Sequence, residues 1–305
     1  MNYINILINQ IIVMFIIIAV GAVIGKTKYF SEQFIQEAGK LLFNIISPIN
    51  VINSYMVGYS KEKSQAILIS FTISIAVYVV SVIIAKALLN QKKYPVEQYG
   101  AIISNCGFLG LPIATAVCGS EASIYAIPFI TCNVAIQMTY GVYVMTGDVK
   151  EISFKAMLKN TSVWGCIIGI TYFFLRIPVI ADVKTAFSSL ASMVSPLSCL
   201  LIGINLSTTN IKDILKDKMS FVSILIRQIV TPLIAVFALK FVSNDLFIVK
   251  LSLLIVMSTP IAAGTSVYAR TCNQDYEKAS RLVCVSTLLC ILTMPVITSL
   301  ATAIW

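Results

Sequence analysis

The stretch Asn105-Cys-Gly-Phe-Leu-Gly-Leu-Pro112-Ile113-Ala114 places a proline and two glycines in the middle of a long apolar segment. The sequence Pro-Ile-Ala of its last three residues recurs 148 residues later as Pro260-Ile261-Ala262, and the same offset carries Ser47-Pro48 onto Ser195-Pro196. Two pairs of prolines with matching neighbours indicate an internal duplication. Corresponding interrupted helices in the two halves of a chain are typical of secondary transporters.

The composition indicates an integral membrane protein of the all-α class. Hydrophobic residues make up 58% of the chain and charged residues 11%, whereas soluble domains are roughly half apolar and a quarter charged. The apolar stretches are continuous and about 20 residues long, which favours helices in a lipid bilayer over the shorter alternating strands of a barrel. Ten transmembrane helices are predicted, at about residues 5–25, 38–58, 65–90, 98–118, 123–146, 157–178, 183–206, 220–242, 246–269 and 280–303.

The basic residues follow the loops, so the net charge of +9 does not indicate a nucleic-acid partner. With the N-terminus outside, the inner connections hold Lys26, Lys28, Lys40, Lys86, Lys92, Lys93, Lys150, Lys155, Lys159, Lys212, Lys216, Lys218, Arg270, Lys278 and Arg281. The outer connections hold fewer, namely Lys61, Lys63, Arg176, Lys184, Lys240 and Lys250. The positive-inside rule therefore predicts a multi-pass protein of the cytoplasmic (inner) membrane with both termini outside.

The duplication divides the chain into a first five-helix repeat, residues 1–148, and a second, residues 149–305. Because each repeat has an odd number of helices, the second repeat must be inverted relative to the first. Inverted repeats place the breaks in helices four and nine near one another at the bilayer midplane, where such folds keep their substrate site. The sequence therefore predicts where the binding site lies.

The first break is expected to unwind helix four around Pro112. Proline removes a backbone donor and clashes with the carbonyl four residues back, and Gly107 and Gly110 weaken the turns before it. Pro112 then suits the first position of an outer half-helix. The N–H groups of Ile113 and Ala114 would consequently point back at the midplane.

The second break, Ser258-Thr259-Pro260-Ile261-Ala262-Ala263-Gly264, repeats this arrangement from the other direction. Two half-helix N-termini then converge, each with roughly half a positive charge from the helix dipole. Together they favour an anion, and an organic carboxylate is the expected ligand. The alternative is that the prolines only kink their helices, as membrane proteins tolerate. The paired register of the two breaks favours the binding site.

Small polar residues form stripes inside several spans, and two interpretations stay open for them. They either face the transport path and help to bind the substrate or a cation, or they hydrogen-bond one helix to the next. The residues are Asn44, Ser47, Asn50 and Asn53 on helix two, Ser192, Ser195 and Ser198 on helix seven, and Asn133 and Gln137 on helix five.

Charged residues are almost absent from the middle of the spans. Arg227 is the exception. It either has a functional role or has a structural one, in which it snorkels to the membrane interface or bonds to carbonyls at a helix break. No Asp or Glu lies at the middle of a span, so a coupling proton or sodium ion would need neutral ligands or the substrate's own protonation. The chain has no histidine and no phosphate-binding loop. These absences argue against an enzyme, a metal site, a cofactor and ATP as the energy source.

Taken together, these motifs resemble the auxin efflux carrier family, which includes plant PIN-type carriers and bacterial malate permeases. The resemblance rests on Asn105 through Pro112 followed by Gly119, on Pro260 through Ala269, and on Ser280, Ser286-Thr287-Leu288-Leu289, Thr293-Met-Pro295 and Arg227 with Pro232. It spans the whole chain.

The resemblance implies a division of labour between the helices. Helices 1, 2, 6 and 7 would form a scaffold that dimerises, and helices 3–5 and 8–10 a transport unit that moves across it like an elevator. It also implies that the broken helices cross at Pro112 and Pro260 and that Asn105 contacts the substrate carboxylate.

The sequence thus predicts a secondary active or facilitative carrier for a small organic anion, such as malate or an auxin-like acid. A membrane-embedded sensor that binds the same ligand without transport is the alternative, and a channel is a second one. The candidate binding residues are Asn105, Gly107, Gly110, Pro112, Ile113, Ala114, Ser258, Thr259, Pro260, Ile261, Ala262 and Gly264, with Asn44, Ser47, Asn50, Asn133 and Gln137 as further polar contacts.

Overall fold

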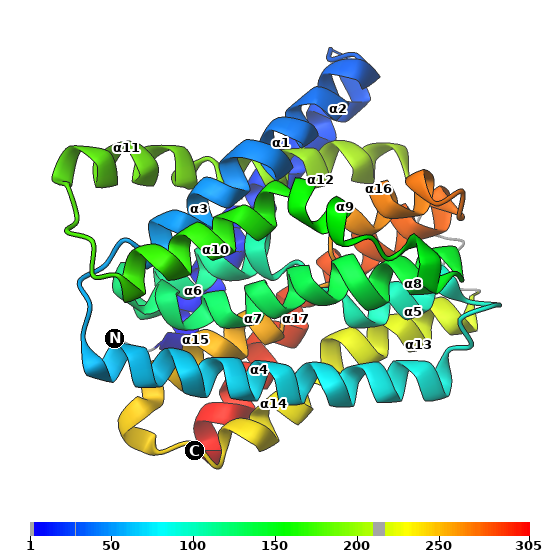
Figure 1. The fold of residues 1–305 in the computed structure, drawn as a ribbon. Coiled ribbons are helices and arrows are strands. Elements are labelled where there is room, and N and C mark those ends of the chain that lie inside the picture. The colour runs from blue at the N-terminus through cyan, green and yellow to red at the C-terminus, as the bar shows by residue number, and fades with distance from the viewer. Residues whose placement is uncertain (1–2, 28, 210–216) are drawn as a thin grey trace.

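The computed structural model describes residues 3–27, 29–209 and 217–305, and within them the chain is predominantly helical, with no β-strand (Figure 1). Lys28, Lys212 and Lys216, which the charge argument places at inner connections, lie outside the described residues. The α-helices are α1 (Tyr3–Thr27), α2 (Glu32–Leu41), α3 (Ser47–Tyr55), α4 (Lys61–Leu88), α5 (Pro95–Ile102), α6 (Leu111–Cys118), α7 (Ser123–Ile136), α8 (Val142–Thr146), α9 (Phe154–Lys159), α10 (Thr161–Phe174), α11 (Ala181–Ser192), α12 (Val194–Thr208), α13 (Lys218–Leu225), α14 (Thr231–Leu239), α15 (Phe247–Met257), α16 (Gly264–Thr271) and α17 (Tyr276–Ile304).

Six helical segments of the described chain are long and apolar enough to cross a membrane. They are Tyr3–Thr27, Lys61–Leu88, Ser120–Thr146, Ala181–Thr208, Lys218–Lys240 and Tyr276–Ile304. Two shorter apolar helices are Cys106–Cys118 and Thr161–Phe174. The all-helical membrane class is therefore confirmed, whereas the count of ten spans stays a prediction.

Three prolines widen a helix without ending it. The π-helical turns Leu42–Ile46, Cys106–Gly110 and Ile226–Val230 are each followed, two residues on, by a proline: Pro48, Pro112 and Pro232. Because the proline ring clashes with the carbonyl four residues earlier, the preceding turn opens. A single wide turn accommodates the clash while the helix continues.

Two helix pairs pack through glycines with their backbones nearly in contact. In the first pair, α1 lies along α12, and a Cβ atom at Gly203 would overlap the carbonyl oxygen of Ile18. In the second, α10 lies along α3, and a Cβ atom at Gly165 would stand 2.9 Å from the Cα of Pro48. Small residues are what allow such close approach between membrane helices.

The two most deeply buried helices are α5 and α15. Every residue of α5 after Pro95 is buried, and so is every residue from Val249 to Met257 in α15. Helices α4, α13 and α17 pack against α5, and α4, α7, α14 and α17 pack against α15. Each of the two buried helices ends in an extended segment, so the centre of the bundle holds irregular backbone shielded on all sides, as membrane depth requires.

The chain termini lie at one end of the bundle. In Figure 1 the N and C labels are at the left, near the turn that enters α4, while α5, α13 and α16 extend to the right. Both termini on one side agrees with an even number of crossings. Which side faces the cytoplasm stays a prediction from the charges.

Candidate functional site

Two extended segments cross at the centre of the molecule. Ser104 and Ile261 form an isolated antiparallel bridge. The Asn105 N–H donates to the Pro260 carbonyl at 2.8 Å, and the Ala262 N–H donates to the Ile103 carbonyl at 3.1 Å. The ends of four helices, α5, the helix beginning at Cys106, α15 and α16, therefore meet at one point.

The structure corrects the position of the first break. Residues 103–105 are the unwound ones, whereas Gly107, Gly110 and Pro112 lie within a helix that runs from Cys106 to Cys118. The reason is the π-helical turn, which accommodates Pro112 without unwinding. Ile113 and Ala114 consequently lie well inside the helix, where backbone N–H groups are bonded to the preceding turn.

The second break lies where the sequence predicts it. Ser258 through Ala263 lie outside the flanking helices, and Gly264 begins α16. Pro112 and Pro260 are consequently not equivalent in the structure, since one lies inside a helix and the other in the extended segment. Gly110 still has a packing role, because a Cβ atom there would stand 2.7 Å from the Thr259 Cγ2.

One side chain from a neighbouring helix holds each extended segment. Asn133 of α7 accepts from the Ser104 N–H at 3.1 Å and donates to the Ser104 carbonyl at 3.3 Å. The same Asn133 oxygen accepts from the Tyr78 hydroxyl at 2.6 Å. On the other segment, the Ser286 hydroxyl of α17 accepts from the Ile261 N–H at 3.2 Å. The crossing backbone is therefore paired on both of its sides.

Within the part of the chain that the structure describes, the side-chain amide of Asn105 has no hydrogen-bond partner. Its residue is 2% exposed, and neither its Oδ1 nor its Nδ2 makes a hydrogen bond. The helix that starts at Cys106 leaves its first-turn N–H groups without helical acceptors beside it. A buried amide without a partner is costly, and here it stands beside a helix N-terminus, which favours anions.

The N-terminus of α16, at Gly264, also lies among polar side chains. The hydroxyls of Ser258 and Thr265 are buried without a hydrogen bond. Gln137 and Phe43 lie beside Gly264, since a Cβ atom on that glycine would stand 3.9 Å from the Gln137 Nε2 and 3.7 Å from the Phe43 ring. Gln137 therefore lies near the first residue of α16, and its role as a polar contact stays a prediction.

The polar residues on helix two do not all have the same role: among the described residues, one of them hydrogen-bonds to a neighbouring helix, and the other three do not. Asn44 is exposed, Ser47 and Asn50 are half-buried, and none of their side chains makes a hydrogen bond within the described chain. The Asn53 Oδ1, by contrast, accepts from the Ser188 hydroxyl at 3.1 Å and so joins one helix to the next. Within the described residues, no hydrogen bond joins Asn44, Ser47 or Asn50 to the Asn105 side chain.

Arg227 bonds to carbonyls at the helix breaks, which was one of its two interpretations. Its Nη1 donates to the Ile102 carbonyl at 3.4 Å, and its Nη2 donates to the Met257 carbonyl. Ile102 and Met257 are the last residues of α5 and α15. The buried guanidinium therefore joins the C-terminal ends of both buried half-helices.

An ion cluster at the other end of α5 is a feature that the sequence analysis missed. Glu97 is 2% exposed, and its carboxylate pairs with the Lys278 ammonium at 2.9 Å. Lys278 also pairs with Asp217 at 3.1 Å. Burial opposes the charge of Asp217, but bonds from Lys278 and Ser220 outweigh it and hold its pKa below the ordinary value. The partners are far apart in sequence, so no local pattern could have paired them.

Replacing Lys278 by methionine is expected to destabilise the protein by about 2 kcal/mol, because it leaves the buried Glu97 carboxylate without a counter-charge. Thermal unfolding in detergent measures the change, and Glu97→Gln in the same chain should restore much of it. The stabilisation that comes from the pair of Lys278 with Asp217 is present at neutral pH and is lost as the pH falls through the lowered pKa of Asp217. This stabilisation should therefore decrease only below pH 3.8, the ordinary pKa of an aspartate. Equal stability of Lys278→Met and the wild type at neutral pH would contradict the argument.

Comparison with known proteins adds a family assignment. A family model described as membrane transport protein matches residues 145–298, which is half of the chain. The matched part includes Arg227, the second extended segment and Ser286, while Asn105 lies outside it. No curated protein matches the chain.

Proposed function

Since this chain belongs to the membrane transport protein family, whose members are transporters, we propose that it is a secondary carrier for a small organic anion. The observation that carries the proposal is Asn105, whose buried, unpartnered amide stands at the N-terminus of the helix Cys106–Cys118. An amide donor and a helix N-terminus together suit a carboxylate. The free acceptor on the same amide would take a hydroxyl or a protonated group of the ligand.

Two inverted repeats are part of the proposal, and the pairing of the helices supports them. α1 packs on α12, and α10 packs on α3. If α1 of the first repeat corresponds to α10 of the second, and α3 corresponds to α12, then the α1–α12 contact and the α10–α3 contact are equivalent. The symmetry that exchanges the two repeats turns one into the other. The glycine pairs Gly21 and Gly25 on α1 and Gly165 and Gly169 on α10 lie at these two contacts. Asn133 and Ser286, which hold the two extended segments, correspond in the same way.

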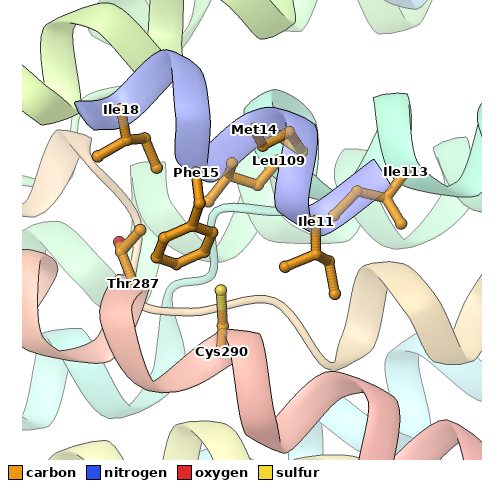
Figure 2. A pocket seen from close by; sticks show the side chains of 8 residues that line it. All are labelled: Ile11, Met14, Phe15, Ile18, Leu109, Ile113, Thr287 and Cys290. Carbon is orange, nitrogen blue, oxygen red and sulfur yellow. The ribbon is translucent and has the colours of Figure 1, made fainter. Parts of the chain in front are cut away.

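Alternating access by an elevator movement is the mechanism we propose. The surface between α1 on one side and the helix Cys106–Cys118 and α17 on the other supports this mechanism. A small pocket at this surface is lined by apolar side chains (Figure 2). The lining residues are Ile11, Met14, Phe15, Ile18, Leu109, Ile113, Thr287 and Cys290. Thr287, the one hydroxyl among them, bonds to the Val283 carbonyl of its own helix. A surface without hydrogen bonds across it opposes sliding less than a polar one. A dimeric scaffold formed by α1, α3, α10 and α12 belongs to the same proposal.

Binding of carboxylates to the purified protein tests the proposal, and Asn105→Ala should weaken it about 10- to 100-fold, as expected for a lost hydrogen bond to a charged group. Asn105→Asp keeps the shape but adds a negative charge, so it should weaken carboxylate binding further. Asn9→Ala, on the exposed face of α1, is the matched control. The panel contains mono- and dicarboxylates and their neutral amides.

Flux into sealed proteoliposomes separates a carrier from the alternatives. A carrier shows saturation and counterflow of the bound carboxylate, a channel shows neither, and a sensor binds without flux. Equal binding of acids and amides, unaffected by Asn105→Asp, would overturn the anion proposal and leave only the transporter family.

A further inference from the structure

Arg227 is a fully buried charge that has no carboxylate partner. It lies in the π-helical turn Ile226–Val230, with no exposed surface. Among the described residues, every ion pair involves other side chains. Burying an ion without compensation costs several kcal/mol. Its neighbours must therefore supply negative charge in another form.

The helix dipoles supply that charge. The two carbonyls to which Arg227 donates end α5 and α15, and each helix C-terminus carries about half a negative charge. Two such ends add to about one charge, which balances one guanidinium. Planar guanidinium, with its forked donors, can reach two separate acceptors at once.

This balance leaves the opposite helix ends uncompensated. The crossing holds two C-terminal ends and two N-terminal ends, and the guanidinium cancels only the negative pair. It also lies within electrostatic range of Cys106, the first residue of the outer helix. The charge that remains at the crossing is consequently positive, and the Asn105 amide stands within it.

Carbonyl oxygens at interrupted membrane helices are the usual ligands of a coupling cation. We propose that Arg227 is a tethered cation which takes that place at the carbonyls of Ile102 and Met257, and thereby determines the preference of the site for anions. Only the second part of this inference, the preference of the site for anions, rests on the proposed anion carrier. Arg227 is a positioning residue in this scheme, since it acts on the ligand through the charge balance of the helix ends.

Substitution of Arg227 separates its charge from its hydrogen bonds. Arg227→Gln keeps donors but removes the charge, so the binding ratio of a carboxylate to its neutral amide should fall at least about tenfold. Arg227→Lys keeps the charge and should retain the ratio even where stability falls. Arg176→Gln, which removes an exposed charge that stacks on the Tyr59 ring, should leave the ratio unchanged.

A second measurement needs no substrate. Arg227→Ala leaves the two carbonyl ends without a cation, so guanidinium, lithium or sodium ions at millimolar concentration should raise its melting temperature and leave that of the wild type unchanged. If no cation stabilises Arg227→Ala and Arg227→Gln keeps the wild-type ratio, the inference is overturned. If the cations stabilise the variant but the wild type binds no carboxylate, the tethered cation stands and the anion-carrier proposal fails. Arg227→Gln and Arg227→Lys keep the test decisive if Arg227→Ala does not fold.

Discussion

Gly203→Ala is expected to lower the free energy of unfolding by about 3 kcal/mol or more, beyond the usual range for an overpacked core. A Cβ atom at this position would overlap the Ile18 carbonyl oxygen and stand 2.8 Å from the Ala22 nitrogen. Both are backbone atoms of α1, which no change of rotamer can move. Helices α1 and α12 must separate along their whole contact, so the protein should elute as an aggregate or melt at a clearly lower temperature.

Gly39→Ala is the matched control for this substitution. Gly39 lies in α2, and a Cβ atom there would meet nothing within 4 Å. Alanine is favoured over glycine inside a helix by up to about 1 kcal/mol, so the control should be neutral or stabilising. The same chemical change thus has opposite signs at the two sites. Equal melting temperatures for both variants would refute the backbone contact between α1 and α12.

Sequence reasoning located the crossing but misplaced its first half. The proline offset of 148 residues predicts equivalent breaks at Pro112 and Pro260. In the structure Pro112 is inside a helix, and the unwound segment lies at residues 103–105. Extended backbone forms there because Asn133 and Pro260, both distant in sequence, supply its hydrogen bonds. Local rules for proline hold no information about such partners.

The glycine contacts were within reach of the sequence and were missed. Gly21 and Gly25, and again Gly165 and Gly169, have the spacing by which membrane helices pack closely. They are 144 residues apart, close to the proline offset, and so carry the same duplication. The pairing of Glu97 with Lys278 could not be predicted locally, since only the fold brings the N-terminal end of α5 to the start of α17.

Arg227 shows how far a sequence can narrow a role. Its isolation in an apolar span left two interpretations, and bonds to carbonyls at the breaks were one of them. That both carbonyls end buried half-helices is a fact of the structure. The electrostatic argument for an anion depends on this fact, because without Arg227 the negative helix ends would offset the positive ones.

Asn133→Leu is expected to destabilise the crossing by about 3 kcal/mol or more. The substitution keeps the approximate volume but removes both partners of the Ser104 backbone and the acceptor of the Tyr78 hydroxyl. Each buried polar group left without a partner costs about 1–3 kcal/mol. The three groups share one side chain, so their costs are not simply additive. Thermal unfolding in detergent measures the loss, with Asn9→Leu on the exposed face of α1 as its control.

The reactivity of the Cys106 thiol reports whether Asn133→Leu loosens the crossing itself. Cys106 follows the extended segment directly and is 1% exposed, so it should react slowly with a maleimide in a chain whose other cysteines are replaced. Asn133→Leu should speed this reaction well before global unfolding, because Ser104 is then free to leave its paired position. A variant that melts earlier with Cys106 still protected would mean that Asn133 stabilises the packing of α7 on α4 rather than the crossing. Faster labelling at unchanged melting temperature would instead indicate that the crossing opens as a local unit, which is the freedom that a transport site requires.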